Sequence, residues 1–355
     1  MLEPRAITRV LVADRGEVGA RLVRAVEAAG LESVAVFADE DADAAYLDEA
    51  AYAVRIPPSV GIDPYMDAMG LVTAALDSGS DAVHPGFRGL SRNAEFARVV
   101  HNVGLAWLGP RLDDLEWTLD RVTARHRARD AGLECLPSSP LLHEPRDADP
   151  WCERFGLPAV VRPGRRGQGR TVVAHDAITA RSAVGAAAAN GAFIERALPS
   201  ARHLVVIVIG DGVGNAIHVG EHEASLRGPA GARLRECPSP GVDAPLRDRL
   251  CAAAADFLAA WRFLGVATVH FLLGPDGRPW FSDVEAGLPE GFALHDAVYG
   301  VDLIAAQVSL AAGEDLGWDQ AEFAPNGHAV EVAISCTAPG RLTRFALPDT
   351  PGIDS

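Results

Sequence analysis

Two carboxylates near residue 284 have the chemical type and spacing that could hold a divalent metal ion. Asp283 and Glu285 follow one another in an apolar run, and His270 lies in the apolar run before it. Magnesium prefers hard oxygen ligands, so this segment would deliver two carboxylates to a metal. These residues therefore predict a candidate metal-dependent site.

A β-hairpin over residues 268–292 is the element that would position these side chains. Two short apolar runs, residues 269–273 and 280–284, flank the sequence Gly274-Pro275-Asp276-Gly277. A Pro-Asp-Gly turn between two such runs is a hairpin signal, because its residues suit the turn conformation. We therefore expect the carboxylates on the second strand and His270 on the first.

Composition limits the classes of function. The chain has 355 residues, of which 48% are hydrophobic, so it is long enough for two or three compact lobes. Its formal net charge of −16 argues against partners such as nucleic acid or an anionic membrane surface. No apolar run approaches the roughly 20 residues that cross a bilayer, and residues 1–5 show no signal-peptide pattern. We expect a cytoplasmic protein.

The basic and sulfur-containing residues exclude several kinds of chemistry. The sequence contains no lysine, so all 32 basic residues are arginines. This excludes a Schiff-base lysine, a Walker-A lysine and a lysine carrying covalent biotin. The five cysteines are scattered and lack C-x-x-C spacing, so we expect buried thiols rather than a disulfide framework or a zinc site.

The first hundred residues alternate between predicted strands and helices. We predict strands at residues 7–13, 33–37, 81–84 and 105–108, and helices at residues 18–28, 63–76 and 93–100. This alternation implies a parallel sheet. The turn Gly16-Glu17-Val18-Gly19 lacks the G-x-G-x-x-G fingerprint, so it predicts a plain strand-to-helix connection rather than a dinucleotide site.

A series of short motifs in a fixed order gives the chain a family resemblance. Single motifs of this kind are weak, but their order over more than 300 residues is specific. The chain resembles biotin carboxylase, the ATP-grasp subunit of acyl-CoA and pyruvate carboxylases. The motifs are Val12-Ala13-Asp14-Arg15-Gly16-Glu17, His84-Pro85-Gly86-Phe87, Leu90-Ser91-Arg92-Asn93, Leu108-Gly109-Pro110, Pro238-Ser239-Pro240-Gly241, Gly300-Val301-Asp302-Leu303-Ile304 and Gly327-His328-Ala329-Val330-Glu331.

The resemblance implies an α/β and α+β protein with the ATP-grasp fold. A Rossmann-like parallel-sheet domain would span residues 1–112, and a linker helix would span residues 113–130. A small lid would follow at 131–200, with strands at 159–162 and 171–174 around a loop at 163–170. A mixed-sheet central lobe with a truncated C-terminal domain would complete the chain at 201–355.

Carrying the family's nucleotide contacts across gives a partly preserved ATP site. Two lysines that hold phosphates in the family become arginines, which keep the charge but could instead pair with a carboxylate. The adenine hinge and the ribose contact keep their residue types. The positions are Arg121 and Arg162 for the phosphates, Glu195 and Leu198 for the hinge, and His203 for the ribose.

The catalytic positions are changed more severely. The resemblance places the family's two metal glutamates at His270 and Asp283, and Glu285 replaces an asparagine; a histidine is an unfavourable magnesium ligand. Gly287 stands where the family has its bicarbonate-binding arginine, and Gly291 where it has its general base. Two further phosphate-directed and bicarbonate-directed positions are alanines, and the biotin-contacting arginine aligns near an aspartate: Ala230, Ala232 and Asp354.

Three functions remain open from the sequence. The first is a non-catalytic subunit that associates with a biotin-dependent carboxylase; it would keep the fold, and residual ATP binding is compatible with it, whereas magnesium binding is not expected. The second is an ATP-dependent ligase with a changed acceptor, which would use Arg121, Arg162, Asp283 and Glu285. The third is a surviving biotin carboxylase. The loss of the metal, base and bicarbonate positions together favours the first.

Overall fold

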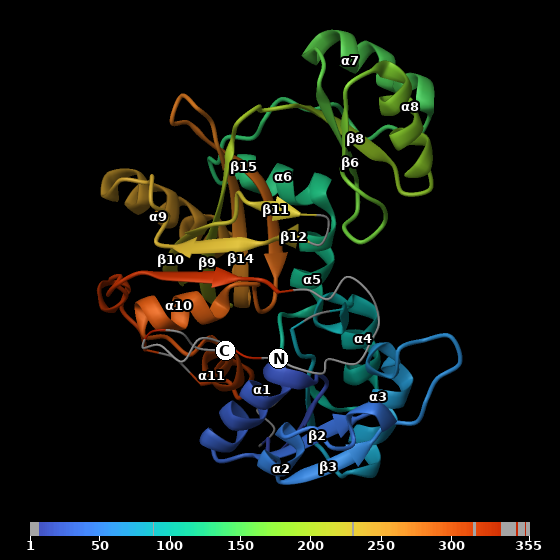
Figure 1. Cartoon of the computed structure of the whole chain (residues 1–355), viewed down its shortest axis with the longest axis vertical. Coiled ribbons are helices and arrows are strands. Elements are labelled where there is room, and N and C mark those ends of the chain that lie inside the picture. Colours follow the sequence, from blue (N-terminus) through green and yellow to red (C-terminus); the bar gives the residue numbers. More distant parts are fainter. Residues whose placement is uncertain are drawn as a thin grey trace.

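A computed structural model describes residues 7–87, 89–228, 231–314 and 317–334, together with residues 346 and 352. Its elements form three regions that follow one another along the vertical axis of Figure 1. The N-terminal sheet lies at the bottom, the large central sheet in the middle, and a small lid with α7 and α8 at the top. The expected positions 230 and 354 lie outside the described residues.

The N-terminal region is the parallel sheet that the alternating pattern predicted. Its strand order is β3-β2-β1-β4-β5, and every pairing is parallel. Apolar strands such as Val10 to Val12 are fully buried, because helices cover the sheet. The strands are β1 (Arg9–Val12), β2 (Glu32–Phe37), β3 (Tyr52–Arg55), β4 (Ala82–His84) and β5 (Ala106–Trp107), and the helices are α1 (Gly16–Ala28), α2 (Tyr46–Glu49), α3 (Ala68–Asp77) and α4 (Ala94–Asn102).

The predicted helix at 63–76 is in fact two elements. A short 3₁₀ turn at Pro64–Met66 precedes α3, and Asp67 separates them. The Asp67 side chain accepts hydrogen bonds from the backbone N–H groups of Met69 and Gly70, which is the ordinary way to cap a helix N-terminus. Asp63 and Asp67 are the N-cap residues of the 3₁₀ turn and of α3, so each element has its own cap.

The lid is a small lobe with its own hydrophobic core. Its three-stranded sheet has the order β7-β6-β8 and is antiparallel. Its buried residues, among them Val161, Val184 and Ile194, form a cluster separate from the other cores. The elements are α7 (Asp149–Phe155), β6 (Ala159–Pro163), β7 (Val172–Ala174), α8 (Ala177–Ala186) and β8 (Ala192–Arg196). The predicted lid strands at 159–162 and 171–174 correspond to β6 and β7.

The central region is a six-stranded sheet of order β15-β14-β9-β10-β13-β16. Its strands pair antiparallel, and a parallel bridge between Cys135 and Phe281 lies at its β15 edge. A separate two-stranded piece, β11 (Arg227–Gly228) with β12 (Gly231–Ala232), lies beside it. The strands are β9 (Arg202–Asp211), β10 (Ala216–Glu223), β13 (Leu234–Cys237), β14 (Leu264–Leu273), β15 (Pro279–Ala286) and β16 (Ala329–Val332).

Helices cover this sheet and connect it to its neighbours. The buried face of α9 packs on β9 and β10, and its residues Phe257 and Leu258 are fully buried. No helix of the described residues has the length and apolar character needed to cross a membrane. The helices are α5 (Leu112–Leu119), α6 (Arg121–Asp130), α9 (Ala244–Ala260), α10 (Phe292–Tyr299) and α11 (Leu303–Ala311).

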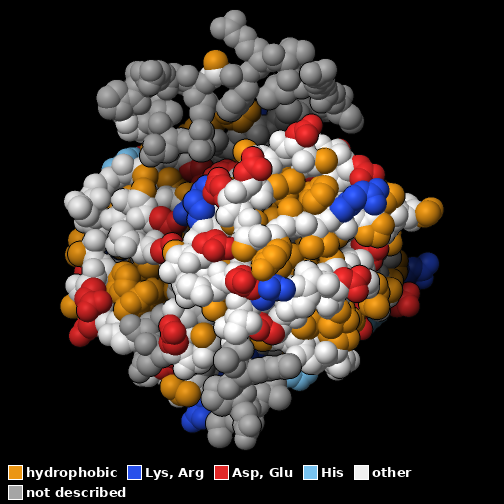
Figure 2. Space-filling model, turned by 90° about the horizontal axis from the view of Figure 1, so that it is seen from below, with side chains coloured by type: hydrophobic (Ala, Val, Ile, Leu, Met, Phe, Trp, Pro, Cys, Tyr) orange, Lys and Arg blue, Asp and Glu red, His pale blue; other side chains and the backbone are white. Residues whose placement is uncertain are grey.

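The surface seen from below Figure 1 carries charges of both signs. Acidic and basic side chains are interspersed there with hydrophobic ones, and the basic side chains do not gather into one patch (Figure 2). A mixed surface of this kind does not supply the continuous positive field that attracts a phosphate backbone.

An ion pair connects the N-terminal region to the central lobe. Arg21 on α1 pairs with Asp296 on α10, and its guanidinium also lies 4.3 Å from the centre of the Phe292 ring. Burial raises the pKa of Asp296 to about 6, although Arg21 opposes the shift. Its other oxygen, Oδ1, has no hydrogen-bond partner among the described residues. Arg21 therefore offsets only part of the cost of burying the ionised Asp296 carboxylate.

We expect Asp296→Asn to stabilise the protein at pH 8 by about 1–2 kcal/mol. The folded pKa lies above the unfolded value near 3.8, so the folded chain binds the extra proton and wild-type stability rises as the pH falls from 6 to 4. The advantage of the variant should therefore disappear below about pH 4. Urea unfolding from pH 8 to pH 4 measures this. As a control, Asp149→Asn should lower the stability of the protein at pH 8, because Arg181 lowers the pKa of Asp149. If the stability difference between wild type and Asp296→Asn stays constant from pH 8 to pH 4, the prediction is wrong.

Candidate functional site

The predicted hairpin is present and places both carboxylates on β15. In its antiparallel register His270 pairs with Asp283, and Thr268 pairs with Glu285. A register shift after His270 makes Ser282 an extra residue on β15, which is how a β-bulge re-aims neighbouring side chains. Asp283 and Glu285 stand two residues apart on a regular part of the strand, so they point to the same face of the sheet.

An arginine from the lid loop lies between these two carboxylates. Arg166 Nη2 is 2.6 Å from Asp283 Oδ2, and Arg166 Nη1 is 2.5 Å from Glu285 Oε1. The backbone N–H of Arg166 also donates to the carbonyl oxygen of Leu119 at the end of α5. The loop that connects β6 to β7 is therefore bound directly to the central lobe at the predicted metal position.

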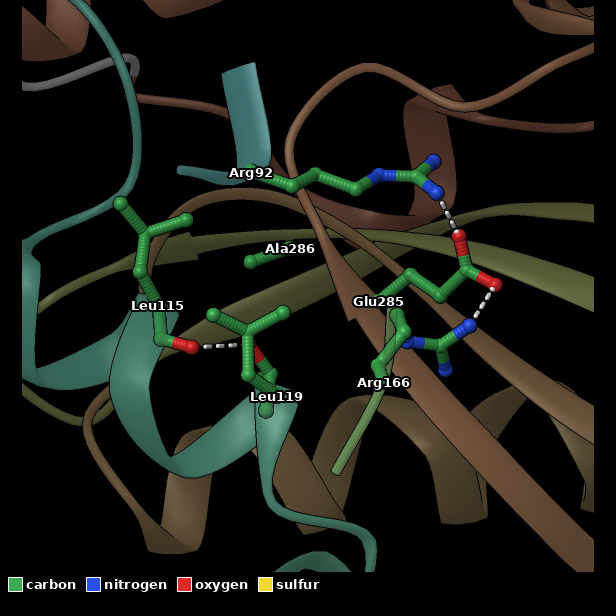
Figure 3. Close-up of a pocket in the computed structure, with 7 residues that line it drawn as sticks. Arg92, Leu115, Leu119, Arg166, Glu285 and Ala286 are labelled. Atoms are coloured by element: carbon green, nitrogen blue, oxygen red, sulfur yellow. Dashed lines mark hydrogen bonds and ion pairs between the residues drawn. The ribbon is translucent and has the colours of Figure 1, made fainter. Parts of the chain in front are cut away.

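Two further arginines complete the neutralisation of these carboxylates. Arg121 at the start of α6 donates from Nε to Asp283 Oδ2 at 3.0 Å. Arg92, from the N-terminal region, pairs with Glu285 Oε2. Figure 3 shows Arg92 and Arg166 approaching the Glu285 carboxylate from two sides. Each carboxylate thus has two guanidinium partners, and the partners come from three different regions of the chain.

The electrostatic consequence is that both acids stay ionised. Burial raises the pKa of Glu285, but Arg166 and Arg92 outweigh it and hold the pKa at about 2. Burial likewise raises the pKa of Asp283, and Arg166 and Arg121 lower it far below its ordinary value. A carboxylate that stays deprotonated at neutral pH has no proton to give, so it cannot act as a general acid. Their charge serves to hold the arginines.

A second buried ion cluster lies around Glu195, the predicted adenine-hinge residue on β8. The Glu195 side chain is 2% exposed. One oxygen accepts from Arg125 Nη1 at 2.9 Å, and the other pairs with Arg162 Nε. Arg162 also donates to Ser282 Oγ at 3.2 Å, which brings it beside Asp283. Arg162, expected at a phosphate, is therefore held by a carboxylate of its own chain.

The predicted ribose contact, His203, lies against His270. The two rings stack with centroids 5.2 Å apart, and His203 Nε2 is 3.1 Å from His270 Nδ1. Arg227 can only donate, so His203 Nδ1 accepts its hydrogen bond, His203 Nε2–H donates to His270, and His270 Nε2–H points to Thr268 Oγ1 at 3.1 Å. Burial lowers the pKa of His203 to about 3 and that of His270 to about 4. Both rings are neutral at pH 7.

The remaining predicted positions have no ionisable side chain and so contribute no ion pair to this site. Leu198 follows β8 and is half-buried. Gly287 and Gly291 have φ angles of +96° and +83°, where a side chain would strain the backbone. Ala232 is buried on β12 in a small apolar cluster.

Both candidate metal carboxylates are engaged by guanidiniums in this structure. Among the described residues, no group of three or more His, Cys, Asp or Glu side chains is placed to hold a metal. Magnesium needs near-octahedral coordination by oxygens. Asp283 and Glu285 already face guanidiniums, and the third side chain near them, His270, offers a nitrogen. A cavity of only about 10 Å³ remains between Arg92, Arg166, Glu285 and α5.

Three of the arginines that define this site were not predicted individually from the sequence. Arg92, Arg125 and Arg166 pair with carboxylates that lie between 70 and 193 residues away in the chain. Local pattern carries no information about such pairings. The available signal was compositional, since the loop at 163–170 contains three arginines in a chain that has no lysine.

Comparison with family models assigns most of the chain to known domains. Residues 6–115 match the model described as "Biotin carboxylase, N-terminal domain". Residues 120–318 match the model described as "Carbamoyl-phosphate synthase L chain, ATP binding domain". Together the two matches cover the N-terminal sheet, the lid and the central sheet through α11.

Individual proteins resemble the chain over nearly its whole length. A biotin carboxylase of Nostoc sp. is 30% identical over 363 residues, which cover 97% of this chain and 81% of that protein. The biotin-dependent acyl-coenzyme A carboxylase alpha3 subunit of Mycobacterium leprae is 31% identical, over 98% of this chain and 61% of that protein. A crystal structure of Campylobacter jejuni biotin carboxylase in a complex with an ATP ligand matches 92% of this chain and 75% of that chain, at 26% identity and a TM-score of 0.86.

Proposed function

Because the chain belongs to the biotin carboxylase family, we propose that it is a non-catalytic, biotin-carboxylase-like subunit that associates with a biotin-dependent acyl-CoA carboxylase. Its family fold, with the ATP-binding domain, would serve recognition by carboxylase subunits rather than carboxylation. The relative in Mycobacterium leprae is itself named as a subunit of an acyl-coenzyme A carboxylase, which supports a partner of this kind.

The observation that carries the proposal is the pairing of Asp283 and Glu285 with arginines. Phosphoryl transfer from ATP needs a divalent ion that bridges phosphate oxygens and neutralises their charge. Arg166 occupies the space between the two carboxylates and pairs with both. A guanidinium neutralises the carboxylates, but its charge is then used within the protein and does not bridge two phosphates. The protein's own lid thus substitutes for the metal.

The residues at the expected bicarbonate-binding and general-base positions support the same proposal. The family resemblance implies an arginine and a glutamate at positions 287 and 291, and both are glycines here. Their positive φ angles show that the backbone has adopted conformations that disfavour side chains. Glu290, the neighbouring carboxylate, does not replace the base, because it pairs with Arg235.

Enzymatic assay separates this proposal from the two catalytic alternatives. We expect no ATP hydrolysis above background with magnesium, bicarbonate and free biotin, because the metal carboxylates are already paired. A biotin carboxylase such as the Nostoc relative, assayed identically, is the positive control. Bicarbonate-dependent turnover would show a surviving carboxylase. Turnover that depends on a different acceptor would favour the ligase.

Association is tested by affinity purification of the full-length chain from its own cells. We expect biotin-dependent carboxylase subunits to be recovered with it. A matched purification of the Nostoc-type biotin carboxylase, expressed in the same cells, controls for subunits that bind any family member. Recovery of the chain alone would overturn the proposal.

A further inference from the structure

The segment between β3 and α3 exposes a group of large apolar side chains. Val60 is fully exposed, and Ile62, Met66 and Met69 are 53%, 44% and 60% exposed. The loop that carries them projects beside α3, in the N-terminal region (Figure 1). Exposed apolar area is unfavourable by about 25 cal/mol per Å², so a group of such residues in one short segment indicates a surface that a partner covers.

Polar contacts hold this loop in one arrangement. Ser59 and Ile62 form an antiparallel bridge, and the Ser59 hydroxyl donates a hydrogen bond to Asp67 at the start of α3. Tyr65 is buried below the loop, and its hydroxyl donates to Asp41 Oδ2 at 2.7 Å. The base of the loop is therefore fixed while its apolar side chains remain exposed. A surface that is already ordered binds a partner at a lower cost in conformational entropy.

Carboxylates surround these apolar side chains. The loop contributes two of them, and residues 39–43 contribute four. Arg15 joins the two segments, because it pairs with Asp41 at 3.2 Å and with Asp63 at 3.9 Å. Among the described residues, Arg55 is the only other cation paired with them, so six carboxylates and two guanidiniums leave an excess of four negative charges. The acids are Asp39, Glu40, Asp41, Asp43, Asp63 and Asp67.

This combination of apolar and acidic side chains limits the kind of partner. Nucleic acid and anionic membrane surfaces are negatively charged, so the carboxylates would repel them. A second copy related by twofold symmetry would bring the same acidic surface against itself, which is unfavourable for the same reason. A different protein, with apolar side chains flanked by arginine or lysine, is complementary to both features.

We propose that residues 59–69 form the docking surface for the carboxylase partner, and that the partner presents apolar side chains flanked by basic ones. The inference rests on the proposed function, because it names the surface through which that association occurs. Val60 and Ile62 pack against the partner together with Met66 and Met69, whose flexible side chains adapt to an irregular apolar surface. The surrounding carboxylates attract the partner's basic side chains and fix its orientation.

Affinity purification of the full-length chain from its own cells tests the apolar part, with the biotinylated carboxylase subunit detected by streptavidin. Val60→Asp combined with Ile62→Asp should lower its recovery roughly tenfold, because the interface would then bury two carboxylates. Both residues are exposed, so the melting temperature should not change. The matched control is Val173→Asp combined with Ile178→Asp, at lid residues that are 51% and 75% exposed, and it should recover as much as the wild type. Equal recovery by the loop variant would overturn the proposal.

The acidic part is tested by charge reversal. Glu40→Arg combined with Asp43→Arg should weaken binding to the recovered carboxylase subunits roughly tenfold and make it less sensitive to salt, because both acids are exposed beside the loop. Glu153→Arg combined with Asp256→Arg, on α7 and α9, is the control and should bind as the wild type does. Biolayer interferometry measures both. Unchanged or tighter binding by the first variant would overturn the proposal, and this test remains if the aspartates at 60 and 62 prevent folding.

The outcomes separate failure of the docking surface from failure of the proposed function. If the wild type recovers no carboxylase subunit, the association is wrong and the surface assignment falls with it. If the wild type and both loop variants recover the subunit equally, the association stands and the docking surface is wrong. Sedimentation of the purified chain should not differ between the wild type and Val60→Asp with Ile62→Asp. A dimer that this variant dissociates would identify a second copy as the occupant and would overturn the proposal.

Discussion

Replacement of Glu195 by alanine should lower the free energy of unfolding by about 3–5 kcal/mol at pH 7. Glu195 is the only carboxylate that pairs with Arg125 and Arg162 in the described network, and its side chain is 2% exposed. Its removal leaves two buried guanidiniums without the carboxylate that pairs with them, and breaking a buried pair costs far more than the pair contributes to stability. Urea unfolding followed by tryptophan fluorescence measures the loss.

The matched control for this experiment is Glu134→Ala. Glu134 also pairs with an arginine, Arg278, but both side chains are about half exposed, at 51% and 53%. Water and counter-ions screen an exposed pair, so its loss should lower the free energy of unfolding far less than the loss of Glu195. If the two substitutions lower the free energy of unfolding by the same amount, burial does not make the Glu195 ion pairs more important than an exposed pair.

The fold was predictable where its determinants are local. The Pro-Asp-Gly turn and its flanking apolar runs specify the β14–β15 hairpin, and the structure has that hairpin with its turn at 274–278. The parallel N-terminal sheet follows from its alternating strands and helices in the same way. Strand β3 was missed, because Tyr52–Arg55 is a largely exposed edge strand without an apolar run.

The family resemblance gave the positions of the site but not its contacts. It placed Arg121 and Arg162 at phosphates and Asp283 at a metal, whereas the structure pairs Arg121 with Asp283 and Arg162 with Glu195. The reason is physical. Alignment identifies which residue stands at a family position, but the partner of a charged side chain depends on every other charge near it. Arg166 adds a positive charge beside Asp283 and Glu285 and pairs with both. Such a pairing depends on long-range geometry that a linear sequence does not display.

The pairing of Asp283 and Glu285 with guanidiniums also determines how the lid is attached. The lid has its own hydrophobic core, separate from the cores of the other regions. Its loop is bound to the central lobe through the backbone of Gly164 and Arg166 and through the Arg166 ion pairs. The loop of the lid is thus held on the central lobe by one of its own side chains. Arg166 is therefore both the counter-ion of the site and the contact that keeps the loop on β15.

Replacement of Arg166 by alanine should accordingly lower the free energy of unfolding by about 2–4 kcal/mol at pH 7. The effect is smaller than that of Glu195→Ala, because Asp283 keeps Arg121 and Glu285 keeps Arg92. The folded pKa of Glu285, about 2, lies below its unfolded value near 4.5, so this stabilisation is present above pH 4.5 and is lost as the pH falls toward 2. The difference between wild type and variant should therefore shrink as the pH falls from 5 to 3.

The same variant tests whether Arg166 excludes a metal from the site. Once the guanidinium is removed, Asp283 and Glu285 face an open position, and millimolar magnesium should raise the melting temperature of Arg166→Ala but not that of the wild type. Arg181→Ala, which breaks an exposed pair with Asp149, should show neither the loss of stability nor the response to magnesium. Equal responses of wild type and Arg166→Ala would mean that the arginine does not exclude the ion. A response confined to Arg166→Ala would mean that one side chain of the lid separates this site from a metal-binding one.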